Sequence, residues 1–166
     1  MARAQTAPAS AEPRDPSSSE GGRVLDGYAI EAQVGFLLRR AHQRQTAIWQ
    51  ACMAEGVGER ELTPRQFSAL VKVVTSLRVT QNQLGRMTAM DPATVQGVVK
   101  RLVARGLVAS GLDPMDRRTI VLTPTADGAD LAARGVAHAR RASEQTLAVL
   151  SAEERRLFLD LLARMS

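Results

Sequence analysis

The side chains best suited to bind another molecule lie in residues 111–128, GLDPMDRRTIVLTPTADG. Turn-forming residues lead to Asp116, Arg117 and Arg118, and residues 119–123 then alternate between polar and apolar. This pattern predicts a β-hairpin with charge at its tip. An arginine at such a tip can enter the minor groove of DNA, where a narrow groove concentrates negative potential. A solvated polar tip explains the same residues, so the preceding segments must decide between the two interpretations.

A second set of binding residues precedes the hairpin, on a helix that Asp91 and Pro92 begin and Gly106 ends. Valines and leucines at i, i+3, i+4, i+7 and i+8 form its buried face. The opposite face is free of acidic residues and suits contact with DNA bases and phosphates. Its candidate DNA-binding residues are Thr94, Gln96, Gly97, Lys100 and Arg101.

Gly97 is the most informative residue of this face. A glycine inside a helix costs about 1 kcal/mol relative to alanine. Gly97 is expected on the exposed side, so packing of the core does not require it. A missing Cβ lets another surface approach the backbone, as in the major groove. A tolerated surface glycine is the alternative.

The elements that position these residues are mainly helical. Capping boxes at Thr63–Gln66, Thr80–Gln83 and Ser151–Glu154 predict three helix starts. The expected order begins with a long helix over 25–55 and three helices over 63–77, 80–87 and 91–105. Two strands over 107–110 and 119–123 follow. A long helix capped at Thr123-Pro124 then reaches about residue 150, and a last helix starts at 151. The fold class is therefore mainly α with a small β-hairpin wing.

The short helix from 80 and the helix from 91 form a helix-turn-helix. Two core helices of an all-α domain would show the same pattern, but the hairpin that follows favours a winged helix-turn-helix. The expected organisation is a disordered arm over 1–23, a winged DNA-binding domain over 59–123, and a helical dimerisation region over 24–58 and 124–166. The arm is rich in Ala, Pro and Ser and cannot bury a core.

Composition excludes several classes of protein. The 166 residues carry 22 basic and 17 acidic side chains, a net charge of +5, which favours a polyanionic partner. One cysteine and two histidines provide neither a disulfide framework nor a zinc site, so we expect no metal and no cofactor. No Ser/His/Asp arrangement or phosphate-binding loop stands out, so we expect no catalytic residues and no enzyme. No signal peptide or membrane span is evident, which predicts a cytoplasmic protein.

Residues 80–128 together resemble the MarR family of winged-helix transcriptional regulators. LVARGLV at 102–108 is followed by the family's wing signature, roughly D-x-R-D-x-R, a strand and L-T-x-x-G. The matching residues are Asp113, Asp116, Arg118, Leu122, Thr123 and, slightly displaced, Gly128. Met115 departs from the signature, because the family usually has arginine there.

The resemblance implies a homodimer that binds a pseudo-palindromic double-stranded DNA operator, most often as a repressor. Arg117 then becomes the candidate for the minor-groove contact. Asp116 is expected to orient an arginine, and Arg118 to pair with Asp116 or with phosphate. The amphipathic first and last helices also favour a homodimer, since they carry more apolar surface than one small winged domain can cover.

The resemblance also implies release from DNA by a small, often aromatic ligand. Arg44 interrupts the apolar stripe of the first helix, and a buried arginine would need an anionic partner. The candidate effector-binding residues are Arg39, Arg40, His42, Arg44 and Trp49. FLLRRAHQRQTAIWQ at 36–50 is similar to regulators of aromatic-acid catabolism, which suggests an anionic aromatic effector, either a free acid or an aryl-CoA thioester. Pairing of Arg44 with an acidic side chain, or its rotation into water, is the alternative.

Two further hypotheses stay open. Cys52 suggests a thiol-based redox sensor, although its place near the end of an apolar helix stripe disfavours a thiolate. A winged domain can also bind other proteins without DNA, although the basic wing argues against that.

Overall fold

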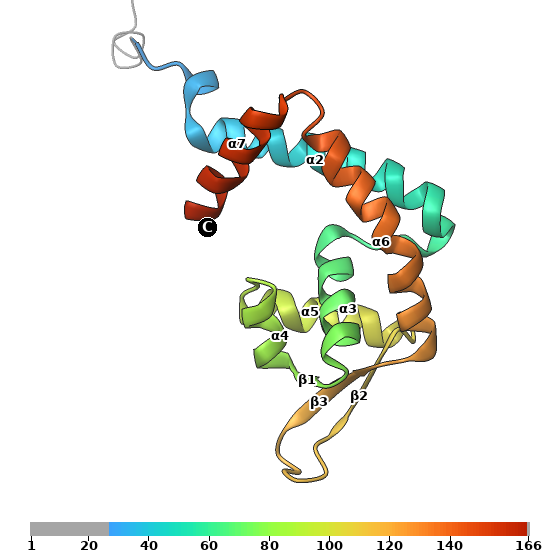
Figure 1. The fold of residues 1–166 in the computed structure, drawn as a ribbon. Coiled ribbons are helices and arrows are strands. Elements are labelled where there is room, and N and C mark those ends of the chain that lie inside the picture. Colours follow the sequence, from blue (N-terminus) through green and yellow to red (C-terminus); the bar gives the residue numbers. More distant parts are fainter. Residues whose placement is uncertain (1–26, 166) are drawn as a thin grey trace, which may run out of the picture. The chain divides into compact units, whose positions relative to one another are not determined.

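The computed structural model describes residues 27–165. The expected arm over 1–23 lies outside the described residues. Contacts divide the chain after Leu38. The described part of the first unit holds a 3-10 helix, η1 (Ile30–Ala32), and the first residues of helix α2 (Val34–Val57). All other elements belong to the second unit, and Figure 1 labels the α-helices and strands along the chain.

Helix α2 differs from the long helix that the sequence predicted. It begins at Val34 rather than near residue 25, and Gly58, in the left-handed region with φ of 56°, follows its last residue. Within the described chain its buried side chains all lie in its second half: Trp49, Cys52, Met53 and Val57. The predicted apolar stripe of this helix is buried at Cys52 in its second half, whereas Val34, Leu37 and Ala41 of the same stripe are exposed in the single chain.

The predicted helix starts before the wing are confirmed. Thr63 and Gln66 form a reciprocal capping box at helix α3 (Pro64–Ser76), and Thr80 and Gln83 do the same at helix α4 (Gln81–Met87). Asp91 caps helix α5 (Pro92–Ala104), where Pro92 occupies the first turn. Each cap satisfies backbone N–H groups that lack a partner inside the helix.

The wing is part of a three-stranded antiparallel sheet rather than an isolated hairpin. Strands β2 (Val108–Leu112) and β3 (Ile120–Pro124) pair from Val108 with Pro124 to Leu112 with Ile120. A short strand β1 (Val79–Thr80), which the sequence did not reveal, pairs with the other edge of β3. The base of the wing is thus tied to the turn between α3 and α4.

Helix α6 (Ala126–Thr146) starts two residues later than predicted. Thr125 is its cap, because its hydroxyl accepts a hydrogen bond from the Gly128 N–H, whereas Pro124 belongs to β3. A Cβ on Gly128 would lie 1.9 Å from the Leu107 carbonyl oxygen, so glycine is required where α6 crosses the start of the wing. Helix α7 (Ala152–Arg164) follows, with the predicted capping box of Ser151 and Glu154.

The core of the second unit is aliphatic with one aromatic pair. Trp49 and Phe67 meet edge to face with ring centroids 5.4 Å apart. Val95, Val98, Val99 and Leu102 of α5 are buried as the sequence predicted, whereas Val103, the last residue of the predicted buried face, is 38% exposed. This packing holds the opposite face of α5 toward solvent, where the candidate DNA-binding residues lie.

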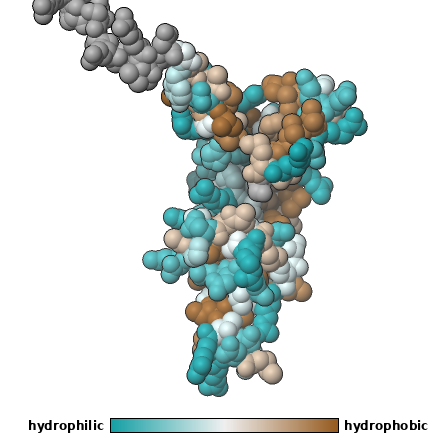
Figure 2. All heavy atoms as spheres, turned by 90° about the vertical axis from the view of Figure 1, so that its left-hand side faces the viewer, coloured by the Kyte–Doolittle hydropathy of each residue, from teal (hydrophilic) through white to brown (hydrophobic). Residues whose placement is uncertain are grey.

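Helix α7 buries none of its described side chains. Figure 2 shows hydrophobic side chains (brown) at the surface in the upper part of the view, whereas the tip of the wing at its lower end is mostly hydrophilic (teal). The exposed apolar side chains of α7 and the residues that flank it are Val149, Leu157, Phe158, Leu159, Leu161, Leu162 and Met165. Among the described helices, none is long and apolar enough to cross a membrane.

Candidate nucleic-acid interface and adjoining pocket

The N-terminus of α5 is held by Asp91. Its carboxylate accepts hydrogen bonds from the Thr94 N–H at 2.9 Å and from the Thr94 hydroxyl at 2.5 Å. These bonds, the hydroxyl bond first, lower the pKa of Asp91 below its ordinary value. The Thr94 hydroxyl therefore donates to Asp91 and keeps its acceptor lone pairs free for a donor group of a base.

The outward face of α5 is polar and open. Gln96, Lys100 and Arg101 are exposed. A Cβ built on Gly97 would meet only the Arg101 Nη1 atom, at 3.7 Å. Packing inside the chain therefore does not require glycine at this position, which agrees with the sequence interpretation.

The tip of the wing is ordered by Asp116. Its carboxylate accepts hydrogen bonds from the Arg118 N–H at 3.0 Å and the Thr119 hydroxyl at 2.7 Å. These two bonds, the hydroxyl bond first, lower the pKa of Asp116. Within residues 27–165 the carboxylate has no ion pair with a guanidinium, so Asp116 holds Arg118 through its backbone N–H, and the alternative pairing of the Arg118 side chain with phosphate stays a prediction. Asp116 instead folds the wing backbone around Arg117.

Asp113 attaches the wing to the rest of the domain. Its carboxylate accepts a hydrogen bond from the Met115 N–H at 2.8 Å and forms an ion pair with Arg78 at 2.5 Å. The first of these, and then Arg78, lower the pKa of Asp113. Arg78 was absent from the sequence-based site, because nothing in a single sequence links it to a residue 35 positions later.

Arg117 and Arg118 project from this ordered tip. Both side chains are exposed, and neither guanidinium has a hydrogen-bond or ion-pair partner within the described part of the chain. Met115 is 92% exposed beside them. The tip thus offers two cations and one apolar side chain to a partner.

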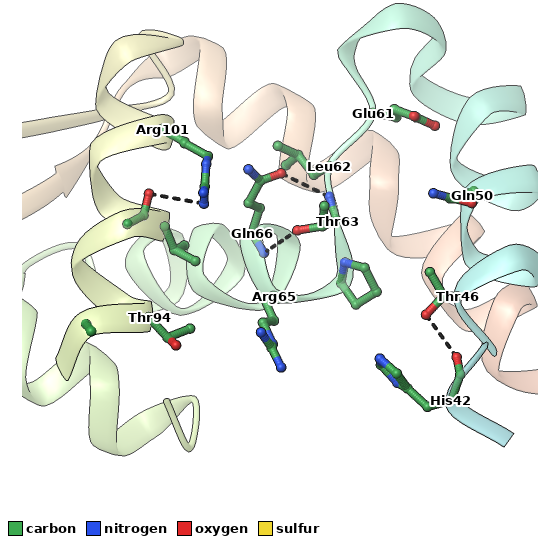
Figure 3. A pocket seen from close by; sticks show the side chains of 14 residues that line it. His42, Thr46, Gln50, Glu61, Leu62, Thr63, Arg65, Gln66, Thr94 and Arg101 are labelled. Atoms are coloured by element: carbon green, nitrogen blue, oxygen red, sulfur yellow. Dashed lines mark hydrogen bonds between the residues drawn. The ribbon is translucent and has the colours of Figure 1, made fainter. Parts of the chain in front are cut away.

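A cavity of about 600 Å³ lies between α2, the start of α3 and α5. Figure 3 shows His42, Thr46 and Gln50 of α2 on one side, Thr94 and Arg101 of α5 on the other, and Thr63, Arg65 and Gln66 at the start of α3 between them. The charged groups of its lining are Arg65, Arg101 and Glu61, with His42 as a further titratable group. The cavity therefore suits a small anion with an apolar part.

Comparison with known proteins decides the family. A model of the MarR family matches residues 61–119. The chain is 41% identical over 140 residues to the HTH-type transcriptional repressor NicR of Pseudomonas putida, which covers 83% of this chain and 85% of the relative. The chain belongs to the MarR family. It is a winged-helix transcriptional regulator of that family.

Two solved structures of the MarR family are similar over most of the chain. One describes regulation of DNA binding of Bordetella bronchiseptica BpsR by 6-hydroxynicotinic acid; it is 38% identical, has a TM-score of 0.75, and covers 83% of this chain and 96% of its own. The other is the PcaV regulator from Streptomyces coelicolor with its natural ligand; it is 29% identical, has a TM-score of 0.74, and covers 82% of this chain and 94% of its own. The winged fold is therefore shared along most of each relative.

The candidate effector residues of this MarR-family chain are not gathered at one place. His42 alone among them lines the cavity. Arg44 is exposed, which agrees with the alternative in which the helix rotates it into water. Trp49 is buried, and its indole N–H donates to the Leu62 carbonyl at 2.7 Å, behind the cavity wall. Arg39 and Arg40 are exposed and lie outside the lining.

The sequence interpretation missed the opposite walls of the cavity. Thr63, Arg65 and Gln66 were identified only as the start of a helix, and Arg101 only as a DNA-binding residue. Their meeting depends on the angle between α2, α3 and α5, which no local pattern reveals.

Cys52 of the MarR-family chain is 1% exposed. Its thiol lies 3.4 Å from the Gln145 side-chain oxygen. Burial on the apolar side of α2 keeps oxidants in solution away from the sulfur, which argues against the redox hypothesis although the Arg141 guanidinium interacts with the thiol.

Proposed function

We propose that this protein is a dimeric repressor that binds an operator through α5 and the wing and is released by a small aromatic acid in the cavity beside α5. One observation carries the proposal: Thr94, Gly97 and Arg101 belong both to the candidate DNA-binding set and to the lining of the cavity. A ligand there touches the helix that reads DNA, so binding of ligand and binding of operator are coupled.

The DNA contacts follow from exposure and charge. Gln96 and Thr94 face the bases of the major groove, and Gly97 allows the helix to lie close to them. Lys100, Arg101 and Arg118 bind phosphates, and Arg117 enters the minor groove. Met115 replaces a wing cation with an apolar contact.

The dimer is supported by the apolar surface of α7, which the single chain leaves exposed. Leu157 and Leu161 are one helical turn apart and 58% and 44% exposed. A two-fold dimer would bury such a surface twice and would place two winged domains on half-sites about one helical turn of DNA apart.

A free aromatic acid suits the cavity better than a CoA thioester. Arg65, Arg101 and His42 provide donors for a carboxylate, and the lining includes one acidic residue, Glu61. The Arg39 and Arg40 pair, which the phosphates of CoA would need, lies outside the lining. The similar protein BpsR, whose DNA binding is regulated by 6-hydroxynicotinic acid, supports a small heteroaromatic acid as the ligand.

The experiment measures operator affinity by fluorescence anisotropy at fixed salt, using DNA from upstream of the protein's own gene. We expect saturating 6-hydroxynicotinate to weaken binding by roughly 5- to 150-fold, the usual range for allosteric coupling. At a concentration 100 times its Kd, the acid would also stabilise the fold by about 2.7 kcal/mol in thermal unfolding.

The control ligand is the corresponding amide, 6-hydroxynicotinamide, which keeps the ring and removes the charge. A response to benzoyl-CoA without a response to any free acid would contradict the proposed ligand class. No salt-dependent binding to the upstream DNA would contradict the operator function itself.

A further inference from the structure

Residues 60–63, between α2 and α3, form one wall of the cavity, and we call them the wall segment. Glu61, Leu62 and Thr63 of this segment line the cavity. Three consecutive carbonyls of the segment accept hydrogen bonds from side chains of other elements. Side-chain bonds to three successive carbonyls fix the path of the backbone, because each would otherwise be free to turn toward water.

Two of these bonds come from Arg105, the residue that caps the C-terminus of α5. Its Nη2 donates to the Arg60 carbonyl at 2.8 Å, and its Nη1 donates to the Glu61 carbonyl at 3.0 Å. The Arg105 N–H itself donates to the Arg101 carbonyl at 3.1 Å, so the residue continues the helix. The planar guanidinium therefore joins the wall segment directly to the end of the helix that reads DNA.

The other side of the wall segment is attached to the core. The indole N–H of Trp49 donates to the Leu62 carbonyl at 2.7 Å, and the Trp49 ring packs edge to face on Phe67. The Arg60 guanidinium pairs with Asp127 of α6 at 2.8 Å. The segment is thus held between the core on one side and α5 on the other.

We propose that Arg105 is a positioning residue that transmits displacement of the wall segment to α5, and so couples the cavity to operator binding. This proposal rests on the proposed function of the cavity. A ligand that displaces Glu61 or Leu62 also displaces the Arg105 guanidinium bonded to this segment. Helix α5 then shifts as a rigid unit, because its 13 residues form a continuous hydrogen-bonded helix. A shift at its C-terminus then changes how its N-terminal residues meet the bases.

The test compares Arg105→Met, which keeps the aliphatic stem and removes every donor, with Arg105→Lys, which keeps the charge but cannot bridge two carbonyls. Arg134→Met is the matched control, since Arg134 is exposed and its ion pair is with Asp130 on its own helix. For each protein, operator Kd is measured with and without saturating 6-hydroxynicotinate. Calorimetry gives the Kd of the acid itself.

We expect both Arg105 variants to bind the acid within about twofold of the parent protein, while the ratio of the two operator affinities falls from the parent's 5- to 150-fold to below about twofold. Arg134→Met keeps the parent's ratio. A parent-like ratio in both Arg105 variants would overturn the proposal, because the coupling would then travel by another route.

A second measurement needs no ligand and separates this proposal from the function of the cavity. Trp49→Phe removes the bond to Leu62 and loosens the wall segment. Amide hydrogen exchange at residues 102–106 should be several-fold faster in Trp49→Phe than in the parent protein. The double variant with Trp49→Phe and Arg105→Met should exchange no faster there than Arg105→Met alone. If Trp49→Phe accelerated exchange equally in the parent protein and in Arg105→Met, Arg105 would not be the link between the wall segment and α5. This conclusion would hold even if 6-hydroxynicotinate proved not to be an effector.

Discussion

At the scale of single residues, the wing tip concentrates three different chemistries in four positions. Met115 is an exposed apolar side chain, Asp116 ties the backbone to Thr119, and Arg117 and Arg118 point away from the domain without partners inside the described chain. Because Asp116 bonds to backbone and hydroxyl groups, both arginines remain available for DNA. The DNA contacts of these residues stay a prediction, and the structure shows that Asp116 bonds to the Arg118 N–H rather than to a guanidinium.

Arg117→Ala should weaken operator binding by about 1–3 kcal/mol, a loss typical of one specific arginine contact. The fold should be unaffected, since the Arg117 side chain has no partner among residues 27–165. Anisotropy titrations at matched salt measure the first effect and circular dichroism the second. Arg134→Ala, which removes the same charge from α6, serves as control. Parent-like affinity of Arg117→Ala would remove Arg117 from the interface.

Gly97→Ala should separate stability from function. The new Cβ would meet only the Arg101 side chain at 3.7 Å, so the free energy of unfolding should rise by up to about 1 kcal/mol through helix propensity. Operator binding should weaken, because the methyl group would hold α5 away from the bases.

Gly128→Ala is the contrasting control for Gly97→Ala, because its Cβ would collide with the Leu107 carbonyl. It should lower the melting temperature. If Gly97→Ala stabilised the protein and left operator affinity unchanged, then α5 would not approach DNA closely at this residue.

At the scale of elements, one carboxylate and one strand pairing join the wing to a segment distant in sequence. Asp113 connects the start of the wing to Arg78 beside β1, and β1 pairs with β3. The orientation of the wing relative to α5 is therefore set by the turn between α3 and α4. A hairpin considered alone would have no such constraint.

The order of the wing should depend on pH. The pKa values of Asp113 and Asp116 are both lowered from the ordinary aspartate value of 3.8, Asp113 chiefly by the Met115 N–H and Asp116 chiefly by the Thr119 hydroxyl. A lowered pKa in the folded state means that these bonds stabilise the wing fully above about pH 4 and lose that effect as the pH falls below it.

Amide exchange of the wing, measured from pH 5 downward and corrected for intrinsic rates, should show this loss of protection. Asp113→Asn should show weakened protection already at pH 5. Protection that stayed constant to pH 2.5 in the parent protein would mean that the carboxylates do not order the wing.

At the scale of the whole molecule, the exposed apolar side chains of α7 form a surface that the single chain does not cover. A helix with no buried residue gains little from its own chain, so a second copy is the occupant that the proposed function requires. Two-fold symmetry doubles every contact, since each residue of the interface appears twice.

Leu161→Glu should convert the dimer to a monomer at micromolar concentration and abolish tight operator binding. Removing one buried leucine costs roughly 1.5–3 kcal/mol, and the symmetric interface loses two. Sedimentation velocity measures the oligomeric state. Ile120→Glu, which alters an exposed apolar residue of the wing, should leave the dimer intact. A stable dimer of Leu161→Glu would place the interface elsewhere.

Local chemistry determined which helices form and where most of them begin. The capping boxes of Thr63, Thr80 and Ser151 operate between side chains and N–H groups three residues away, so the sequence alone specifies them. The same holds for the buried face of α5 and for the two strands of the wing. These features were sufficient to predict a winged helix-turn-helix, and comparison with the MarR family confirmed it.

Only the tertiary structure decided which distant residues meet. Arg78 lies 35 positions from Asp113, and Arg105 lies 44 positions from Glu61, yet each pair is in hydrogen-bond contact. How far along α2 its apolar side is buried was likewise decided by packing, because Trp49 meets Phe67 in the second half of the helix while Val34 and Leu37 in the first half stay exposed. Such contacts depend on the angles between packed elements, which arise from the whole core, and a periodic pattern within one helix does not contain them.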